Sequence, residues 1–215
     1  MTHPAPYNKK LIPIFDRILQ THCKSRYPRI LDPFAGVGRI YHLSTPGQIT
    51  AIDIEQWQDA DPRVIRGNAL NLNYDRQTFD AVITSPTYGN RMADSFTDNQ
   101  PEKDYRRNTY THRLGRKLHA QNSGGIQWGS TYREFHQLAW AEVARVLVED
   151  GLFILNIKDH VRDGKRQRVS RWHYDTILAR GFTPIQIVPV KCPGIRHGAN
   201  RNRISYELVI AFRRK

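Results

Sequence analysis

Cysteine is scarce in this sequence of 215 residues, which has only Cys23 and Cys192, far apart in the chain. Neither belongs to a CxxC pair, and neither has a histidine at the spacing of metal ligands. The sequence therefore predicts no metal site and no disulfide framework. We expect both side chains to be free thiols in a reducing compartment, which makes the cytoplasm the expected location.

Long apolar runs are also lacking. No continuous stretch approaches the roughly 20 apolar residues that a membrane-spanning helix needs, and residues 1–10 lack the apolar core of a signal peptide. No basic amphipathic helix is apparent, so we expect no membrane partner. With 39% hydrophobic residues over 215 positions, we expect residues 1–215 to form a single domain with an ordinary core.

Acidic residues are few relative to basic ones. The chain has 33 Lys and Arg against 20 Asp and Glu, a formal net charge of +13 and a pI near 10.0. Such a balance attracts polyanions and speeds encounter with them, which favours a nucleic-acid partner. A basic soluble protein without such a partner is the alternative explanation.

Apolar patterning predicts an alternation of strands and helices. Runs typical of strands lie at 29–34, 48–54, 63–66, 79–84, 151–157, 185–190 and 205–212. Helical periodicity lies at 9–19, 132–148 and 170–179, the last beginning with Ser170 as N-cap and ending at Gly181. This order predicts an α/β fold with a mostly parallel sheet, helices on both faces and an antiparallel C-terminal hairpin at one edge.

One long segment, residues 91–130, has no sustained periodicity and is polar, basic and rich in tyrosine. An irregular segment of this length in a compact domain is usually functional or mobile. We expect it to be an insertion that recognises the target. A solvated lid with ordinary surface charge is the alternative.

A glycine-rich turn follows the first predicted strand. Gly36 and Gly38 permit a sharp turn and close approach of the backbone to a ligand, and we expect the turn to open a helix. Asp53 lies near the end of the next strand, where a carboxylate can accept both hydroxyls of a ribose. This pair suits any adenosine cofactor, a dinucleotide included.

The stretch from Asp32 to Gly38 reads Asp-Pro-Phe-Ala-Gly-Val-Gly. It resembles the S-adenosylmethionine motif of the amino-methyltransferases that modify DNA, and of some RNA enzymes, which implies a Rossmann-like class I methyltransferase fold and S-adenosylmethionine as cofactor. The resemblance assigns the cofactor to Asp32, Pro33, Phe34, Ala35, Gly36, Gly38, Asp53, Ile54, Glu55, Asn68, Ala69, Ser85 and Pro6. Within this set Asp53 or Glu55 takes the ribose, Asn68 takes the adenine amino group, and the segment containing Pro6 closes over the methionine end. A capping helix without ligand contact is the other interpretation of that N-terminal segment.

A second motif ends the strand at 79–84. Ser85, Pro86, Thr87 and Tyr88 resemble the Ser/Asp/Asn-Pro-Pro-Tyr/Phe catalytic motif of the same enzymes, with Thr87 in place of the second proline. In that family's chemistry the Ser85 side chain and the Pro86 carbonyl would accept hydrogen bonds from an exocyclic amine. Tyr88 would stack on the flipped base and hold it in line with the methyl group. Serine at the first position leans towards cytosine-N4 rather than adenine-N6. Cytosine-C5 chemistry is unlike this pattern, because it needs a cysteine nucleophile after a proline, and Cys192 precedes Pro193 instead.

Basic side chains form two clusters that would suit phosphates or guanine edges. The expected nucleic-acid ligands are Arg91, Arg106, Arg107, Arg113, Arg116, Lys117, Arg196, Arg201 and Arg203.

Together these features favour a DNA amino-methyltransferase, most consistent with N4-methylcytosine. Adenine-N6 methylation of DNA and methylation of an RNA base are the alternatives, because the same motifs and charge serve both. A nucleic-acid-binding protein with a vestigial cofactor site is a further reading, supported by Thr87 and Asn68. Methylation of a protein glutamine fits the serine and the basic surface less well.

Overall fold

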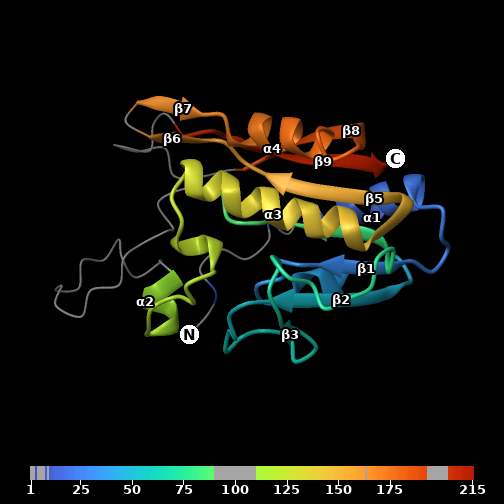
Figure 1. The fold of residues 1–215 in the computed structure, drawn as a ribbon, viewed down its shortest axis with the longest axis horizontal. Helices are drawn as coiled ribbons and strands as arrows, with labels where there is room; N and C mark the ends of the chain where they lie inside the picture. Colours follow the sequence, from blue (N-terminus) through green and yellow to red (C-terminus); the bar gives the residue numbers. More distant parts are fainter. Residues whose placement is uncertain (1–2, 4–7, 9, 90–109, 163, 193–202) are drawn as a thin grey trace.

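The computed structural model describes residues 3, 8, 10–89, 110–162, 164–192 and 203–215 (Figure 1). A seven-stranded sheet forms its centre, in the order β3-β2-β1-β4-β5-β9-β8. The strands are β1 (Arg29–Asp32), β2 (Gln48–Asp53), β3 (Ile65–Arg66), β4 (Phe79–Thr84), β5 (Leu147–Ile157), β8 (Phe182–Lys191) and β9 (Tyr206–Arg214).

Strand direction follows the predicted fold class. Strands β3, β2, β1, β4 and β5 pair in parallel, whereas β9 pairs antiparallel with both β5 and β8. The C-terminal hairpin therefore enters the sheet through β9, and β8 forms the edge. Pro184 and Pro189 lie in this edge strand, where a missing backbone donor is tolerated.

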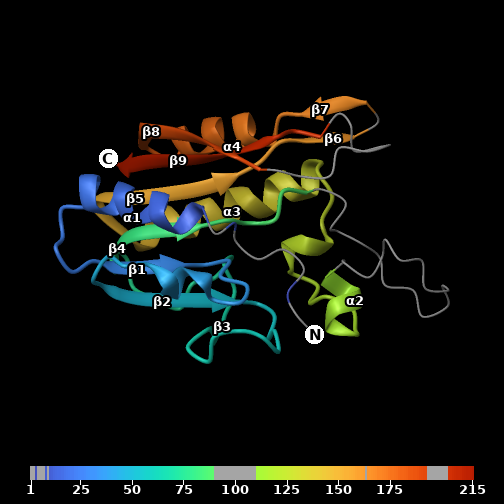
Figure 2. The ribbon, with the colours of Figure 1, turned by 180° about the vertical axis from the view of Figure 1, so that it is seen from behind.

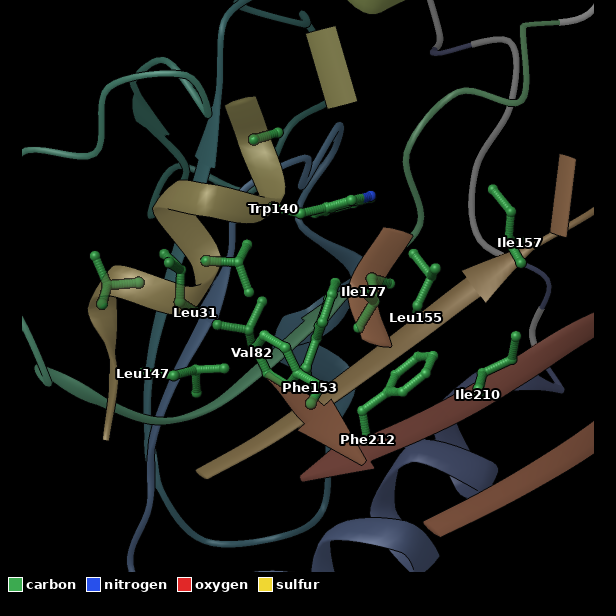
Figure 3. Close-up of a cluster of buried hydrophobic side chains, with 14 of the residues drawn as sticks. Leu31, Val82, Trp140, Leu147, Phe153, Leu155, Ile157, Ile177, Ile210 and Phe212 are labelled. Carbon is green, nitrogen blue, oxygen red and sulfur yellow. The ribbon is translucent and has the colours of Figure 1, made fainter. Parts of the chain in front are cut away.

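Helices cover both faces of the sheet, as predicted (Figures 1 and 2). Helix α1 (Leu11–His22) packs on one face, and its Phe15 and Ile18 join a buried cluster with Ile30 and Ile154. Helices α3 (Ser130–Val146) and α4 (Val169–Leu178) pack on the other face. Figure 3 shows this second cluster, in which the Trp140 ring lies 5.1 Å from the Phe153 ring of β5 between centroids.

The central strand β5 explains why two helical layers are needed. Leu152 and Ile154 belong to the α1 cluster, whereas Phe153 and Leu155 belong to the α3–α4 cluster. Successive side chains of a strand point to opposite faces, so an unbroken apolar strand requires cover on both sides.

The predicted helix after the glycine turn is absent from the described residues. Only a short 3-10 helix, η1 (Arg39–His42), lies there. The chain reaches Ser44 and Thr45 at once, and both residues donate backbone and hydroxyl hydrogen bonds to the buried Asp16 carboxylate. These contacts, with Pro46 and Gly47 following, leave no room for an α-helix between β1 and β2.

The predicted cap of α4 is also wrong. The N-cap is Arg168, which makes no side-chain cap, and Ser170 lies in the first turn of the helix. Its backbone N–H and its hydroxyl donate to Asp159 Oδ1 at 2.8 and 2.7 Å. The Asp159 carboxylate therefore accepts a backbone N–H at the start of α4, where the Ser170 side chain was expected to be the acceptor.

Smaller elements lie beyond the carboxyl ends of the parallel strands (Figures 1 and 2). They are α2 (Tyr110–Leu114), η3 (Ser123–Gly125) and a hairpin of β6 (His160–Arg162) with β7 (Lys165–Gln167). The first two belong to the expected 91–130 insertion, of which residues 91–109 lie outside the described part. None of the helices in the described part is long and apolar enough to span a membrane.

Candidate active site

A cavity lies at the carboxyl ends of β1, β2 and β4. This edge is where open α/β sheets bind ligands. Most residues expected to contact a cofactor line it, namely Pro33, Phe34, Ala35, Gly36, Asp53, Ile54, Asn68, Ala69 and Ser85. Thr87 of the second motif lines the same cavity.

The glycine turn adopts the backbone that only glycine takes easily. Gly36 has φ +55° and Gly38 has φ +79°. A Cβ on Gly38 would lie 2.5 Å from Val64 Cγ2, which is too close for any side chain. Gly36 faces the cavity, whereas Gly38 does not line it, so Gly38 shapes the turn and Gly36 leaves space beside the ligand.

Asp53 is the acidic side chain of the cavity. Its carboxylate accepts the Gly36 N–H at 2.8 Å and the Glu55 N–H at 2.9 Å. Burial, aided by the neighbouring Glu55 carboxylate, raises the Asp53 pKa to about 6 against the effect of these hydrogen bonds. The acid is therefore held rigidly against the glycine turn, with a charge that depends on pH near neutrality.

Glu55, the second candidate for the ribose, does not line the cavity. It is 3% exposed and accepts hydrogen bonds from Arg116 Nη2 at 2.7 Å, His119 N at 2.6 Å and Asn122 Nδ2 at 3.2 Å. Its carboxylate thus ties down residues 116–122. Of the two acids, Asp53 is the one that lines the cavity.

Asn68 and Ala69 form another wall of the cavity. Asn68 Oδ1 accepts the Leu70 N–H at 2.9 Å, and its amide nitrogen donates to Gln121 Oε1 at 3.0 Å. A carbonyl-type oxygen has a second lone pair, so Asn68 retains an acceptor site.

His3, from the N-terminal segment expected to close over the methionine end, and Val37 of the glycine turn also line the cavity. The other lining residues were not predicted as cofactor ligands: Arg39, Trp57, Tyr110, Gln121, Asn122, Ser123 and Phe135. We call residues 110–125 the roof segment, because its members close one side of the cavity. The His3 ring packs edge-on against Trp57 and Tyr110, with centroids 4.4 and 5.5 Å apart. Burial lowers the His3 pKa to about 4 despite the nearby Asp59, so the ring is neutral near pH 7.

Asp32 lies behind the cavity rather than in it. It is fully buried at the end of β1, accepts the Thr84 hydroxyl at 2.7 Å and accepts the Phe34 N–H at 3.1 Å. These bonds join the glycine turn to the end of β4. Asp32 therefore positions both motifs relative to each other.

The second motif follows β4 directly. Ser85 Oγ donates to Asn156 Oδ1 at 2.8 Å, and the Tyr88 hydroxyl donates to the same oxygen at 2.9 Å. Pro86 is buried, while Tyr88 is half-buried and packs against the α3–α4 cluster. Tyr88 does not line the cavity, so its predicted stacking on a base remains a prediction.

Thr87 stands where the motif has its second proline. The proline ring would restrict the turn, and here hydrogen bonds hold Thr87 in place instead. Its carbonyl accepts the Tyr132 hydroxyl at 2.6 Å, and its hydroxyl donates to Ser123 Oγ at 2.8 Å. Behind it, Trp140 Nε1 donates to His173 Nδ1 at 2.9 Å, and His173 Nε2 lies 3.0 Å from the Tyr132 oxygen.

The indole only donates, so His173 Nε2 carries the ring proton and donates to Tyr132. Burial lowers the His173 pKa well below its usual value, which keeps the ring neutral. A buried chain of donors, from Trp140 through His173 and Tyr132, thus ends on the carbonyl of Thr87.

The expected nucleic-acid residues are described only in part. Arg116 is exposed but paired with Glu55, whereas Lys117 and Arg203 are exposed and Arg113 is half-buried. Pro6, Arg91, Arg106, Arg107, Arg196 and Arg201 lie outside the described residues. Within the described ranges, no group of three or more His, Cys, Asp or Glu side chains could hold a metal ion.

Comparison with known proteins gives the fold a context. No protein-family model matches the chain, and no curated protein matches its sequence. Among solved structures, the 1,6-didemethyltoxoflavin-N1-methyltransferase of Burkholderia thailandensis, solved with S-adenosylhomocysteine, is 16% identical. The match covers 97% of this chain and 80% of that one, with a TM-score of 0.54.

Two further solved structures resemble this chain to a similar degree. An S-adenosylmethionine-dependent methyltransferase of Methanosarcina mazei is 14% identical, with 92% and 96% of the two chains covered and a TM-score of 0.53. The [4+2]-cyclase SpnF is 14% identical over 100% of this chain and 84% of its own, with a TM-score of 0.57. Because such a fold also serves a cyclase, activity has to be argued from the site. At these identities the likeness shows the fold, and the chain has the Rossmann-like fold of the class I methyltransferases.

Proposed function

We propose that this protein is an S-adenosylmethionine-dependent methyltransferase that modifies an exocyclic amino group of a nucleobase in DNA, with cytosine-N4 the favoured position. The observation that carries the proposal is a shared cavity. Ser85 and Thr87 of the catalytic-type motif line the same space as Gly36 and Asp53 of the nucleotide-type motif. A methyl donor and an acceptor amine can therefore meet there.

The residues present fit the cofactor. Asp53 offers a carboxylate to ribose hydroxyls, Gly36 allows close approach, and Asn68 and Ala69 line the wall suited to adenine. S-adenosylhomocysteine bound to a structural neighbour supports this choice. When bound, S-adenosylmethionine supplies an activated methyl group on a sulfonium.

The protein's own groups would activate the amine. An exocyclic amine is a poor nucleophile because its lone pair is delocalised into the ring. Acceptors at Ser85 Oγ and the Pro86 carbonyl would hold the N–H groups and turn the lone pair towards the methyl carbon. The bound sulfonium would supply the methyl group and leave as the thioether, and the surplus amine proton would pass to solvent. Orientation supplies most of the acceleration, and no strong base is required.

The charge of the chain supports a nucleic-acid substrate. A formal +13 favours binding of phosphate backbones. Tyr88 follows the cavity-lining residues directly, and an aromatic there would stack on a flipped base. The same charge and motif would serve RNA, which is the runner-up. Serine at position 85 is the feature that favours cytosine-N4 over adenine-N6.

The test is transfer of a labelled methyl group from S-adenosylmethionine to unmethylated duplex DNA and, separately, to unmodified RNA. Asp53→Ala serves as the cofactor-site control. Label in DNA with the wild type, and little with the variant, is the expected result. Label in RNA alone would promote the runner-up. No label in either, together with no binding of S-adenosylhomocysteine, would overturn the proposal.

A further inference from the structure

Ser85 lines the cavity, and a serine hydroxyl can either donate or accept. Which of the two it offers depends on where its own proton goes. Ser85 Oγ lies 2.8 Å from Asn156 Oδ1, and an amide oxygen can only accept. The Ser85 proton is therefore directed to Asn156, which does not line the cavity. Oγ also lies 3.1 Å from the Tyr88 hydroxyl, but that hydroxyl donates its own proton to Asn156 Oδ1, so the lone pairs of Oγ remain for a ligand.

The orientation of the Asn156 side chain is fixed by its surroundings. Asn156 is fully buried in β5, one strand away from the end of β4. Its amide nitrogen donates to the Leu208 carbonyl of β9 at 3.4 Å. The reversed amide would place Oδ1 against that carbonyl oxygen, with no proton between them. The observed orientation is thus the one in which every polar atom of Asn156 has a partner.

The Tyr88 hydroxyl also donates its proton to Asn156. This hydroxyl lies 2.9 Å from Asn156 Oδ1 and 3.4 Å from Glu207 Oε2. Glu207 is buried and also accepts the Asn8 side-chain amide at 3.2 Å. Burial raises the pKa of Tyr88, so the phenol keeps its proton and acts as a donor. Acceptors on the protein side thus draw both hydroxyl protons inward.

We propose that Asn156 is a positioning residue, which takes the Ser85 hydroxyl proton and so makes Ser85 an acceptor for the amino group of the substrate. This inference rests on the proposed function and narrows it. The site then selects a substrate group that donates, such as the amine of cytosine or adenine. Thymine and uracil present a carbonyl oxygen at that position. Two acceptors would then face each other with no proton between them, so these bases would be disfavoured.

A double-mutant cycle tests the inference. Asn156→Leu removes the acceptor and roughly keeps the side-chain volume. We expect kcat to fall about tenfold or more, with the KM for S-adenosylmethionine unchanged. In a Ser85→Ala background, Asn156→Leu should cause no further loss, because the hydroxyl that it positions is gone. An equal loss of kcat in both backgrounds, or a raised cofactor KM, would overturn the inference.

A conservative variant separates positioning from structural support. Asn156→Asp keeps an acceptor oxygen beside Ser85, and a protonated carboxyl can also donate to the Leu208 carbonyl as the amide does. This variant should therefore restore most of the lost kcat at pH values where the new carboxyl is protonated. A loss in Asn156→Asp as large as in Asn156→Leu at every pH would contradict the proposal. Asn156→Ala replaces the leucine variant if that variant does not fold.

The cycle is also measured on unfolding, which needs no substrate. The Ser85–Asn156 bond predicts a coupling of about fivefold in the unfolding equilibrium constant between the two substitutions. If the wild type methylates neither DNA nor RNA, the proposed function fails, and this coupling still decides the proton placement. Absence of coupling would overturn the assignment of Asn156 whatever the activity.

Discussion

Asp53 is the residue whose charge depends most on its surroundings near physiological pH. Burial at the glycine turn raises its pKa to about 6, so the carboxylate is neutralised as the pH falls through 6. A ribose hydroxyl donates more strongly to a carboxylate than to a carboxylic acid. We predict that affinity for S-adenosylhomocysteine falls below pH 6, by up to about tenfold per pH unit. Calorimetric titration between pH 5 and 8 measures this.

Asp53→Asn is the matched control for that titration. The amide keeps the shape of the side chain and cannot titrate, so affinity should be weaker at pH 8 and nearly independent of pH. An unchanged pH dependence in the variant would assign the titration to a group other than Asp53.

Tyr88 carries a second prediction. Its hydroxyl is held by Asn156 outside the cofactor cavity, so its removal should affect the substrate rather than the cofactor. Tyr88→Ala should lower turnover about 10- to 100-fold, since base stacking on an aromatic is worth about 1–3 kcal/mol. Affinity for S-adenosylhomocysteine should change by less than about threefold. Collapse of cofactor affinity would instead assign Tyr88 to the cavity wall or to the fold.

At the scale of elements, α3 and α4 support the catalytic-type motif through buried side chains. Tyr132 of α3 donates to the Thr87 carbonyl and lies beside His173 of α4. We predict that Tyr132→Phe destabilises the protein by about 1–3 kcal/mol, because it leaves buried polar groups unpaired. It should also lower kcat by loosening the turn. Urea unfolding and initial rates measure the two effects.

Tyr174 of α4 is a suitable comparison, since its hydroxyl has no hydrogen bond to another described residue. Tyr174→Phe should leave both stability and kcat close to wild type. Equal effects of the two substitutions would show that Tyr132 acts through general packing rather than through Thr87.

The roof segment depends on a single buried carboxylate. Glu55 accepts hydrogen bonds from Arg116, His119 and Asn122. Bonds to a charged group are worth about 1.5–3 kcal/mol each, so Glu55→Gln should speed amide exchange of residues 116–125 by about tenfold or more. Asp175→Asn, which breaks the exposed ion pair with Arg171, should leave that exchange unchanged. Unaltered exchange in Glu55→Gln would mean that other contacts hold the roof segment.

Sequence patterns predicted the strands well and the connections less well. Strand β4 has the predicted bounds, 79–84, because a short apolar run between polar residues leaves few alternatives. The helix expected after Gly38 failed because Asp16, far away in the chain, holds Ser44 and Thr45. Local propensity contains no information about such a distant partner.

The candidate site shows the same division. Gly36, Asp53 and Ser85 were found because each lies at or just beyond the end of a strand, and parallel strands end at one edge of a sheet. Asn156 and the contacts of the roof segment were not predicted, and Glu55 was predicted as a ribose ligand rather than as a partner of that segment. Their roles depend on which segments fold over the cavity, and an aperiodic stretch gives no signal for that.

At the scale of the whole molecule, buried histidines make stability depend on pH. Burial lowers the pKa values of His3 and His136 to about 4, and that of His173 well below its usual value. Between about pH 4 and 6.5 the unfolded chain therefore binds more protons than the folded one, and stability falls as the pH falls. Asp53 has the opposite sign, because its raised pKa gives the folded state the extra proton between 3.8 and about 6.

A fully buried histidine contributes a loss on the order of 2–4 kcal/mol in the free energy of unfolding over this range. Because three histidines outweigh one aspartate, we predict that the free energy of unfolding falls by several kcal/mol between pH 6.5 and 4. Urea unfolding at several pH values measures it. His136→Phe removes one titrating group and should flatten the profile. A stability that is constant over this range would contradict the neutral, buried histidines.

The identity of the methylated nucleoside tests the central claim most directly. Unmethylated duplex DNA would be incubated with the protein and S-adenosylmethionine, digested to nucleosides and analysed by mass. The account predicts N4-methylcytosine. N6-methyladenine would support amino-methylation of DNA but contradict the preference for cytosine that rests on Ser85. The absence of any methylated nucleoside would contradict the claim that the cavity brings a methyl donor to a nucleobase amine in DNA.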